Sequence, residues 1–249
     1  PRKRCAMSGL SGLSGLSGLS GIAGGNATPI GSINFVSASS QKAASSYNSS
    51  WLMTGNDWTV SFWFYLSGSG TNSMFQIGGG GEMFAAYTNG TTVYARVWVA
   101  GIGYTTPTKT FTGGQWNHYC ARWDEATKNI SIAINNGTPA TGTAPGSLYQ
   151  SGADAPQMGA GVIGFMDGKL DSVGAWVSAG GSGGRLSDAL LTSIYNSGAG
   201  KKYSGLSAGE KVALVSWYDF DTTAGLGADA HGSNTLTLTN SPTCVAGKV

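Results

Sequence analysis

The acidic residues of this sequence do not form the pair that glycan hydrolysis requires. A glycosidase needs two carboxylates about 5–10 Å apart, one on each side of the bond that is cleaved. Asp124 and Glu125 adjoin, so on a strand they would point to opposite faces. The other glutamates, Glu82 and Glu210, both lie next to turns. We therefore expect no enzymatic activity, and a glycan-cleaving enzyme is the weakest of three functions considered.

The histidines and cysteines are also isolated from one another. His118 and His231 have no metal-spaced partner and show no Ser/His/Asp order. Cys5, Cys120 and Cys244 lie far apart, without the spacing of a metal site or a disulfide framework. We expect reduced thiols, with a bridge between residues 120 and 244 as the alternative.

Aromatic residues are the candidates for binding a ligand. Flat aromatic rings on an exposed strand can stack on sugar rings, and sugar-binding sandwiches use such platforms. Tryptophan at alternating strand positions more often serves sheet packing or a subunit interface, so both roles stay open. The candidate ligand-binding residues are Trp63, Trp98, Trp123 and Tyr104.

A glycine at every third position marks the segment "SGLSGLSGLSGLSGIAGG" (8–25). A helix is excluded because each glycine costs about 1 kcal/mol there. The period suits a polyproline II-like chain with three residues per turn, and in a collagen-type trimer only glycine fits the axis. We expect an arm that anchors or trimerises the protein, with a flexible linker as the alternative. The expected assembly residues are Gly9, Leu10, Gly12, Leu13, Gly15, Leu16, Gly18, Leu19 and Gly21.

Composition narrows the class of protein. Only 10% of the residues are charged, against about 25% in an average soluble domain, and 41 residues are glycine. The net charge of +2 gives no reason to expect nucleic acid as a partner.

No apolar run reaches about 18 residues, so we expect no membrane span. No apolar segment follows the basic start, so we expect release by a route other than secretion, such as lysis, unless the chain is cut from a longer precursor.

Alternation of apolar and polar residues predicts an all-β fold. In "WTVSFWFYL" (58–66), one face carries the tryptophan, valine, phenylalanines and leucine, and the other carries Trp63 and Tyr65. About ten such strands follow one another at intervals of about 8–12 residues, which is typical of a sandwich or barrel. One short helix is expected to start after Ser187, its N-cap, and to stop just before Gly198, which would be its C′ glycine. We expect an extended Gly-x-y arm over residues 1–25 and an antiparallel β-sandwich over residues 26–249.

Three blocks in order resemble the laminin G-like domains of the concanavalin A-like jelly-roll class. They are the opening from "SINFV", the hairpin "GQWNHYCARWDEATKNISIAINNG", and the segment "GFMDGKLDSVGAWVSAGGSGGRLSDALLTSIYNSG". The terminal block "LVSWYDFDTTAGLGADAHGSNTLTLTN" resembles the segment that usually begins such a domain. The chain therefore resembles a permuted member of the family, and we expect residues 211–220 to pair within the same sandwich.

The resemblance implies a structural role for His118 and a structural calcium ion at the rim of the sandwich. Oxygen-rich loops suit this hard ion. The candidate ligands are Asp229, Asn234 and Asp221, with Asp219 as an alternative to Asp221 and Asp171 as another acid that matches the family. The alternative is that Asp229 and Asn234 only shape a turn. We expect no other cofactor.

Two functions remain ahead of the enzyme. The first is a non-enzymatic structural protein of a virion, such as a phage decoration or fibre protein at the virion surface. Its partners would be further copies of itself, with a trimer favoured, other virion proteins, and host surface glycans. The alternative is a carbohydrate-binding or adhesin module that is extracellular or on a bacterial cell surface.

Overall fold

A computed structural model describes residues 31–78, 83–99, 102–149, 155–161, 163–178 and 183–249, without the side chains of residues 102–106. The glycine-repeat arm of residues 1–25, with its expected role in assembly, lies outside the described residues.

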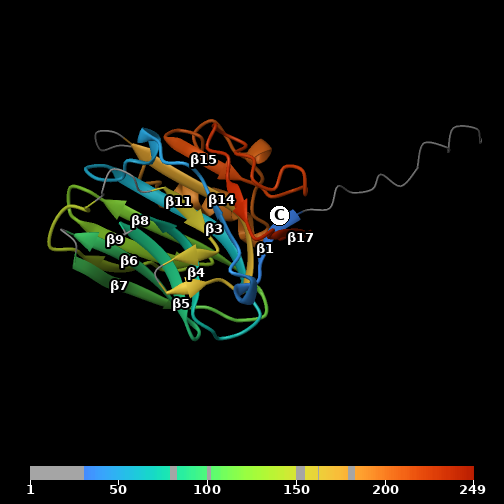
Figure 1. Cartoon of the computed structure of the whole chain (residues 1–249). Coiled ribbons are helices and arrows are strands. Elements are labelled where there is room, and N and C mark those ends of the chain that lie inside the picture. The colour runs from blue at the N-terminus through green and yellow to red at the C-terminus, as the bar shows by residue number, and fades with distance from the viewer. Residues whose placement is uncertain (1–30, 79–82, 100–101, 150–154, 162, 179–182) are drawn as a thin grey trace, which may run out of the picture.

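Two antiparallel sheets form a sandwich, as predicted (Figure 1). The first sheet has the order β10 (Ala140–Thr143), β9 (Asn129–Ile134), β8 (Trp116–Asp124), β3 (Asp57–Leu66), β14 (Gly168–Ser178), β1 (Gly31–Phe35) and β17 (Thr243–Ala246), with β15 (Leu214–Tyr218) also paired to β14. The second has the order β16 (Thr237–Thr239), β2 (Lys42–Ala44), β11 (Pro156–Met158), β4 (Asn72–Ile77), β5 (Phe84–Asn89), β6 (Thr92–Val99) and β7 (Ile102–Thr110). A small hairpin joins β12 (Ala160–Gly161) to β13 (Gly164–Phe165).

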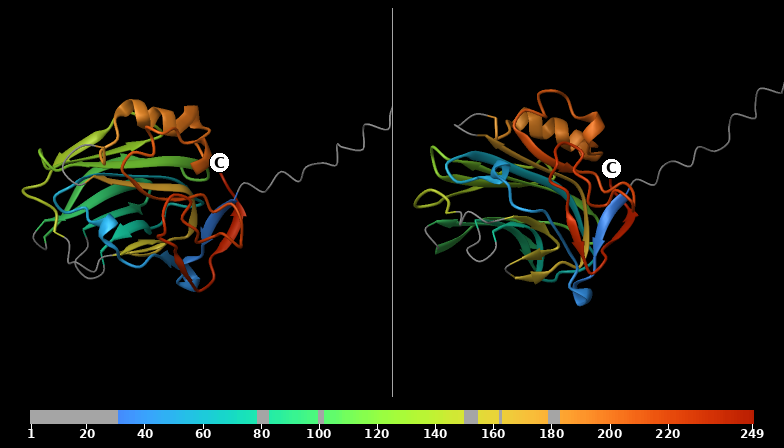
Figure 2. Two further views of the ribbon diagram at one scale, coloured as in Figure 1. Left: turned by 90° about the horizontal axis from the view of Figure 1, so that it is seen from above. Right: turned by 45° about the horizontal axis from the view of Figure 1, so that its top comes forward.

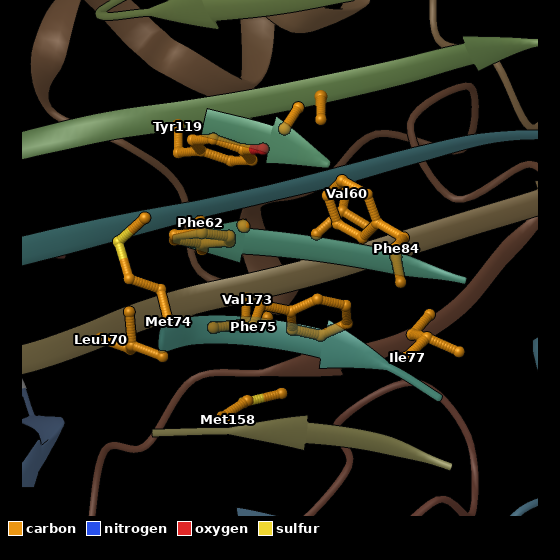
Figure 3. Close-up of a cluster of buried hydrophobic side chains, with 14 of the residues drawn as sticks. Val60, Phe62, Met74, Phe75, Ile77, Phe84, Tyr119, Met158, Leu170 and Val173 are labelled. Carbon is orange, nitrogen blue, oxygen red and sulfur yellow. The ribbon is translucent and has the colours of Figure 1, made fainter. Parts of the chain in front are cut away.

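The core lies between the two sheets, and the alternation in β3 decides which side chains enter it. Phe62 and Phe64 are fully buried there, and Phe62 stacks on Tyr119 of β8 with ring centroids 4.7 Å apart. Figure 3 shows the same layer, in which side chains of the first sheet face those of the second. The residues labelled there are Val60, Phe62, Met74, Phe75, Ile77, Phe84, Tyr119, Met158, Leu170 and Val173. The opposite side of β3 is therefore the outer face of the first sheet, and it carries Trp63 and Tyr65.

The C-terminal segment belongs to the same sandwich, as predicted. β15 pairs with the second half of β14, while β1 pairs with its first half. A bulge between Asp171 and Gly174 separates the two halves. A Cβ at Gly174 would lie 2.6 Å from the rings of Trp176 and Trp217. Only glycine therefore fits at this position, where β14 pairs with β15. β16 pairs with β2 and β17 with β1, so the C-terminus lies beside β1 (Figures 1 and 2).

The predicted helix forms as α1 (Asp188–Tyr195), across the outer face of the first sheet (Figure 2). Ser187 is its N-cap, and the Ser187 hydroxyl accepts a hydrogen bond from the backbone N–H of Leu190. The helix ends one residue earlier than a C′ glycine at Gly198 predicts, because Asn196 adopts the left-handed conformation as the C-cap, and a 3-10 turn over Asn196–Gly198 follows. Leu191 and Ile194 pack on Cys120 and Trp176 of the sheet. The remaining helical turns are of the 3-10 type: η1 (Ser37–Ser39), η2 (Ser49–Trp51), η3 (Asn196–Gly198) and η4 (Tyr203–Gly205).

Candidate functional site

The predicted ligand-binding aromatics do not form one site, and three of them are buried. Trp123 is fully buried in the core, so its expected exposure was wrong. Trp98 is 6% exposed on the outer face of the second sheet, with the Arg96 guanidinium 4.5 Å from its ring centroid. Tyr104 lies opposite Val97 in β7, but its side chain is outside the described part of the structure.

Trp63 lies on the outer face of the first sheet, as its position in β3 predicted, but it is only 3% exposed. The ring of Tyr195, at the end of α1, stacks on it with centroids 5.6 Å apart and 19° between the planes. The Lys248 ammonium lies 5.0 Å from the Trp63 centroid. The helix and the C-terminal segment therefore cover the Trp63 ring, which is the packing role that the sequence left open beside sugar stacking.

These same residues border an open hollow of about 390 Å³. Its lining combines three aromatic side chains with two amides and one ammonium group. The lining residues are Trp63, Gln115, Trp116, Asn135, Tyr195, Gly198 and Lys248. We refer to this group as the aromatic hollow.

The exposed aromatic surface of the aromatic hollow comes from Trp116 and Tyr195, both half-buried. Trp116 begins β8 one residue after the turn "TGG" (112–114), so it stands at the end of the sheet. The Tyr65 ring supports it from β3, with an edge-to-face contact at 5.8 Å between centroids. Aromatic pairs of this kind hold each other in one orientation. The two exposed rings are thus fixed before any ligand arrives.

The polar groups of the aromatic hollow divide into fixed and free ones. Asn135 is fixed, because its carbonyl oxygen accepts a hydrogen bond from the backbone N–H of His118 at 2.8 Å and its amide donates to Asn117. Gln115 is exposed, and its side chain makes no hydrogen bond to another described residue. Lys248 forms no ion pair within the described part of the chain. The hollow therefore offers a free amide and a free ammonium group beside aromatic rings.

His118 lies beneath the aromatic hollow and has the structural role that the resemblance implied. Its ring shares a hydrogen bond with the Ser61 hydroxyl, at 2.8 Å between Nε2 and Oγ, and its centroid lies 5.0 Å from that of Trp63. Desolvation by complete burial lowers the pKa of His118 to about 3. The imidazole is therefore neutral near pH 7. Because His118 and Ser61 are both sealed off, this pair cannot reach a substrate.

A buried carboxylate anchors the segment that carries Lys248. Asp171 is fully buried on the outer side of β14, and burial raises its pKa. Its Oδ2 accepts hydrogen bonds from the backbone N–H groups of Lys248 and Val249, at 2.7 and 3.0 Å. The Lys202 ammonium lies 3.3 Å from Asp171 Oδ1 and 2.6 Å from Asp221 Oδ1. These contacts place the C-terminal residues over Trp63.

The predicted calcium ligands are occupied by other partners. The Asp229 carboxylate accepts backbone N–H groups from Trp217, His231 and Asn234, at 3.0, 3.0 and 3.1 Å. The Asn234 amide donates to the Ser216 hydroxyl at 2.7 Å. Asp219 accepts the indole N–H of Trp217.

The residues described in the structure include no group of three His, Cys, Asp or Glu side chains that could hold a metal ion. The geometry thus matches the turn-shaping alternative for Asp229 and Asn234, and it gives the calcium prediction no support.

The other chemically active groups are held in structural contacts. The Glu125 carboxylate accepts the indole N–H of Trp123 and the Ser147 hydroxyl. Glu210 is buried and pairs with Lys201 at 2.7 Å. Cys120 and Cys244 are free thiols, since Cys120 faces α1 and Cys244 packs against the core. Among the residues described here, no helix has both the length and the apolar character to cross a membrane.

The fold and this geometry can now be compared with known proteins. A laminin G family model for the concanavalin A-like lectin/glucanases superfamily matches residues 37–182. The chain belongs to this superfamily. The matched residues begin after β1 and end before α1. The strands β15, β16 and β17 follow the matched residues in the sequence and pair within the same two sheets. No curated protein sequence matches the chain.

Several solved structures share the superfamily's sandwich. A Bacteroides ovatus protein, provisionally named as carbohydrate-binding, aligns with a TM-score of 0.61 and 16% identity, over 87% of this chain and 60% of that one. NanB sialidase from Streptococcus pneumoniae aligns with a TM-score of 0.50 and 17% identity, over 66% of this chain and 27% of the enzyme. The CBM40 domain of a Ruminococcus gnavus sialidase aligns with a TM-score of 0.48 and 16% identity, over 66% of this chain and 95% of the domain. This chain thus spans 60% of the length of the Bacteroides ovatus protein, and at these identities the likeness shows the fold alone.

Proposed function

We propose that the protein binds carbohydrate at the aromatic hollow, without cleaving it. The observation that carries the proposal is the arrangement of Trp116 and Tyr195 next to the free Gln115 amide and the Lys248 ammonium. A sugar ring has apolar C–H faces that pack on aromatic rings and hydroxyl groups that hydrogen-bond to amides. Pockets that bind small ligands typically have apolar and aromatic walls, with a few polar groups that orient the ligand.

The comparison with the Bacteroides ovatus protein also favours binding over the virion role. That protein has the same sandwich and is provisionally named for carbohydrate binding. Neither the described residues nor the comparisons support the virion and trimer predictions, which stay predictions for the arm. An extracellular or cell-surface location is part of this proposal, because that is where a glycan-binding module meets its ligand.

A glycan array followed by isothermal titration with the strongest ligand tests the proposal. Trp116→Ala should weaken binding by about tenfold or more, as expected for a central aromatic residue at a binding site. Gln115→Ala should weaken it by less, since one amide is lost. The matched control is Tyr149→Ala, because Tyr149 is 48% exposed outside the aromatic hollow. No binding to any glycan, or an equal loss in Tyr149→Ala, would overturn the proposal.

A further inference from the structure

Polar and aromatic side chains continue from the aromatic hollow across the outer face of the first sheet. The strand register places Trp116 of β8 opposite Tyr65 of β3, and Tyr65 opposite Lys169 of β14. Lys169 lies opposite Asn34 of β1, and Asn34 opposite Thr243 of β17. We refer to these five residues as the cross-strand row. Trp116 belongs to both the aromatic hollow and the cross-strand row, so the two surfaces are continuous.

The members of the cross-strand row share one face because of the strand periodicity. Phe64, Leu170 and Ile33 pack in the core between the sheets. Their sequence neighbours Tyr65, Lys169 and Asn34 therefore point outward. All five members are half-buried or exposed. The helix does not cover them, since the apolar side chains of α1 pack on Cys120 and Trp176, further along the strands.

The polar members of the cross-strand row have unused bonding capacity. The side chains of Asn34, Lys169 and Thr243 form no hydrogen bond or ion pair with another described residue. The Lys169 ammonium lies 5.0 Å from the Tyr65 ring centroid, where the ring holds it without neutralising it. The row thus presents two aromatic rings, a cation, an amide and a hydroxyl in sequence.

The length of the cross-strand row indicates what it could bind. Neighbouring strands lie about 4.8 Å apart, so a row over five strands extends roughly 19 Å, which is longer than a single sugar ring. Lys169 in the cross-strand row and Lys248 in the aromatic hollow are both positively charged, and neither forms an ion pair with a described residue. Asp171, whose carboxylate accepts the backbone N–H of Lys248, is already compensated by Lys202 and by two backbone N–H groups.

We infer that the site binds an acidic glycan chain laid across the strands, with a carboxylate or sulfate group at Lys169. This inference rests on the proposed carbohydrate-binding function and adds the ligand class. A terminal sugar would occupy the aromatic hollow alone. A chain would extend from it over Tyr65 and Lys169 toward Asn34 and Thr243.

Affinity electrophoresis on the whole chain tests the inference, with polygalacturonate, alginate and hyaluronan as acidic probes and galactan and xyloglucan as neutral ones. We expect retardation in the acidic gels, weakened by sodium chloride, and an affinity for galacturonate oligomers that rises from the disaccharide to the hexasaccharide. Lys169→Gln should weaken binding about tenfold, the effect of losing one hydrogen bond to a charged group. Asn34→Ala should weaken binding to the hexasaccharide and leave binding to the disaccharide unchanged.

The matched control is Lys211→Gln, which removes the same charge from a lysine held over the Tyr203 ring at 4.1 Å, outside the row. It should leave binding unchanged. Asp167→Asn removes an exposed acid two residues before Lys169 and should strengthen binding to the acidic probes. If Trp116→Ala abolishes binding while Lys169→Gln and Asn34→Ala have no effect, or if neutral glycans bind as tightly as acidic ones, the inference fails and the proposed function stands. If no probe binds, the inference fails, and the glycan array alone decides whether the proposed function stands.

Discussion

The phenol ring of Tyr195 lies nearly parallel to the indole of Trp63, with 19° between the planes and 5.6 Å between the centroids. The pair joins the last residue of α1 to the third residue before the end of β3, and the aromatic hollow opens beside it. Replacing Tyr195 by alanine should expose Trp63 and lower the free energy of unfolding by about 1–2 kcal/mol. Tyr195→Phe keeps the stacked ring and should stay near the wild-type value. Urea denaturation followed by tryptophan fluorescence measures both, and equal losses in the two variants would contradict the stacking account.

The neutral state of buried His118 should make the stability depend on pH. Its pKa is about 3 in the folded protein and 6.5 in a model peptide, so between these values the unfolded chain binds more protons. Stability therefore falls as the pH falls from about 6.5, by roughly 2–3 kcal/mol at about pH 4.5 from this residue alone. His118→Gln should be less stable near neutral pH but lose less stability on acidification. Urea denaturation at a series of pH values gives the difference between the two proteins, and parallel pH profiles would refute the assignment.

Asp229 should be important for stability without any metal ion. Its carboxylate accepts three backbone N–H groups, so Asp229→Ala leaves three donors without this partner. We expect a loss of about 2–3 kcal/mol, with Asp229→Asn in between. Thermal melts of the wild type with calcium chloride and with EDTA should coincide. A melting temperature that rises with calcium in the wild type, but not in Asp229→Ala, would instead identify Asp229 as a calcium ligand.

The buried pair of Asp171 and Lys202 should show a measurable coupling. Asp171→Ala removes an acceptor for Lys202 and for the two C-terminal N–H groups, and we expect it to cost about 3 kcal/mol. Lys202→Met leaves the buried Asp171 carboxylate with the two backbone donors and the Ser172 hydroxyl but no cation, and it should cost a similar amount. The double variant should be more stable than the sum of the two losses predicts, by about 1–2 kcal/mol. Purely additive losses in chemical denaturation would show that the ion pair itself contributes nothing.

Local patterns in the sequence were sufficient to predict most of the fold. Period-2 alternation in β3 assigned Trp63 and Tyr65 to the face away from the core, and the Ser187 cap marked the start of α1. Both signals depend on neighbouring residues, which the sequence displays directly. The helix stops at Tyr195 because Asn196 already adopts the left-handed conformation, so Gly198 lies two residues past the C-cap instead of the one residue that was predicted.

The site was harder to predict because it is assembled from distant segments. Trp63 lies on the outer face, as the alternation in β3 predicted, but its cover comes from Tyr195 and Lys248, which are far along the chain. Trp116 was overlooked, although its alternation with His118 and the preceding turn placed it at the end of the outer face. Nothing in the sequence near Lys248 could show that Asp171 holds that segment over Trp63. Contacts between these distant segments depend on how β14 aligns with β3, β1 and β15. Local residue preferences do not determine that alignment.

The antiparallel pairing of β1 with β17 also determines how the molecule responds to mechanical tension. Gly31 lies opposite Ala246 at one end of this pair, and Asn34 lies opposite Thr243 at the other. A force that pulls Gly31 and Ala246 apart loads one hydrogen-bonded pair at a time, so the strands open like a zipper at low force instead of shearing together. The opening starts at the end away from Asn34 and Thr243. A ligand that bridges Asn34 and Thr243 would hold together the last pairs to separate. It would therefore raise the force needed to detach β17 from β1.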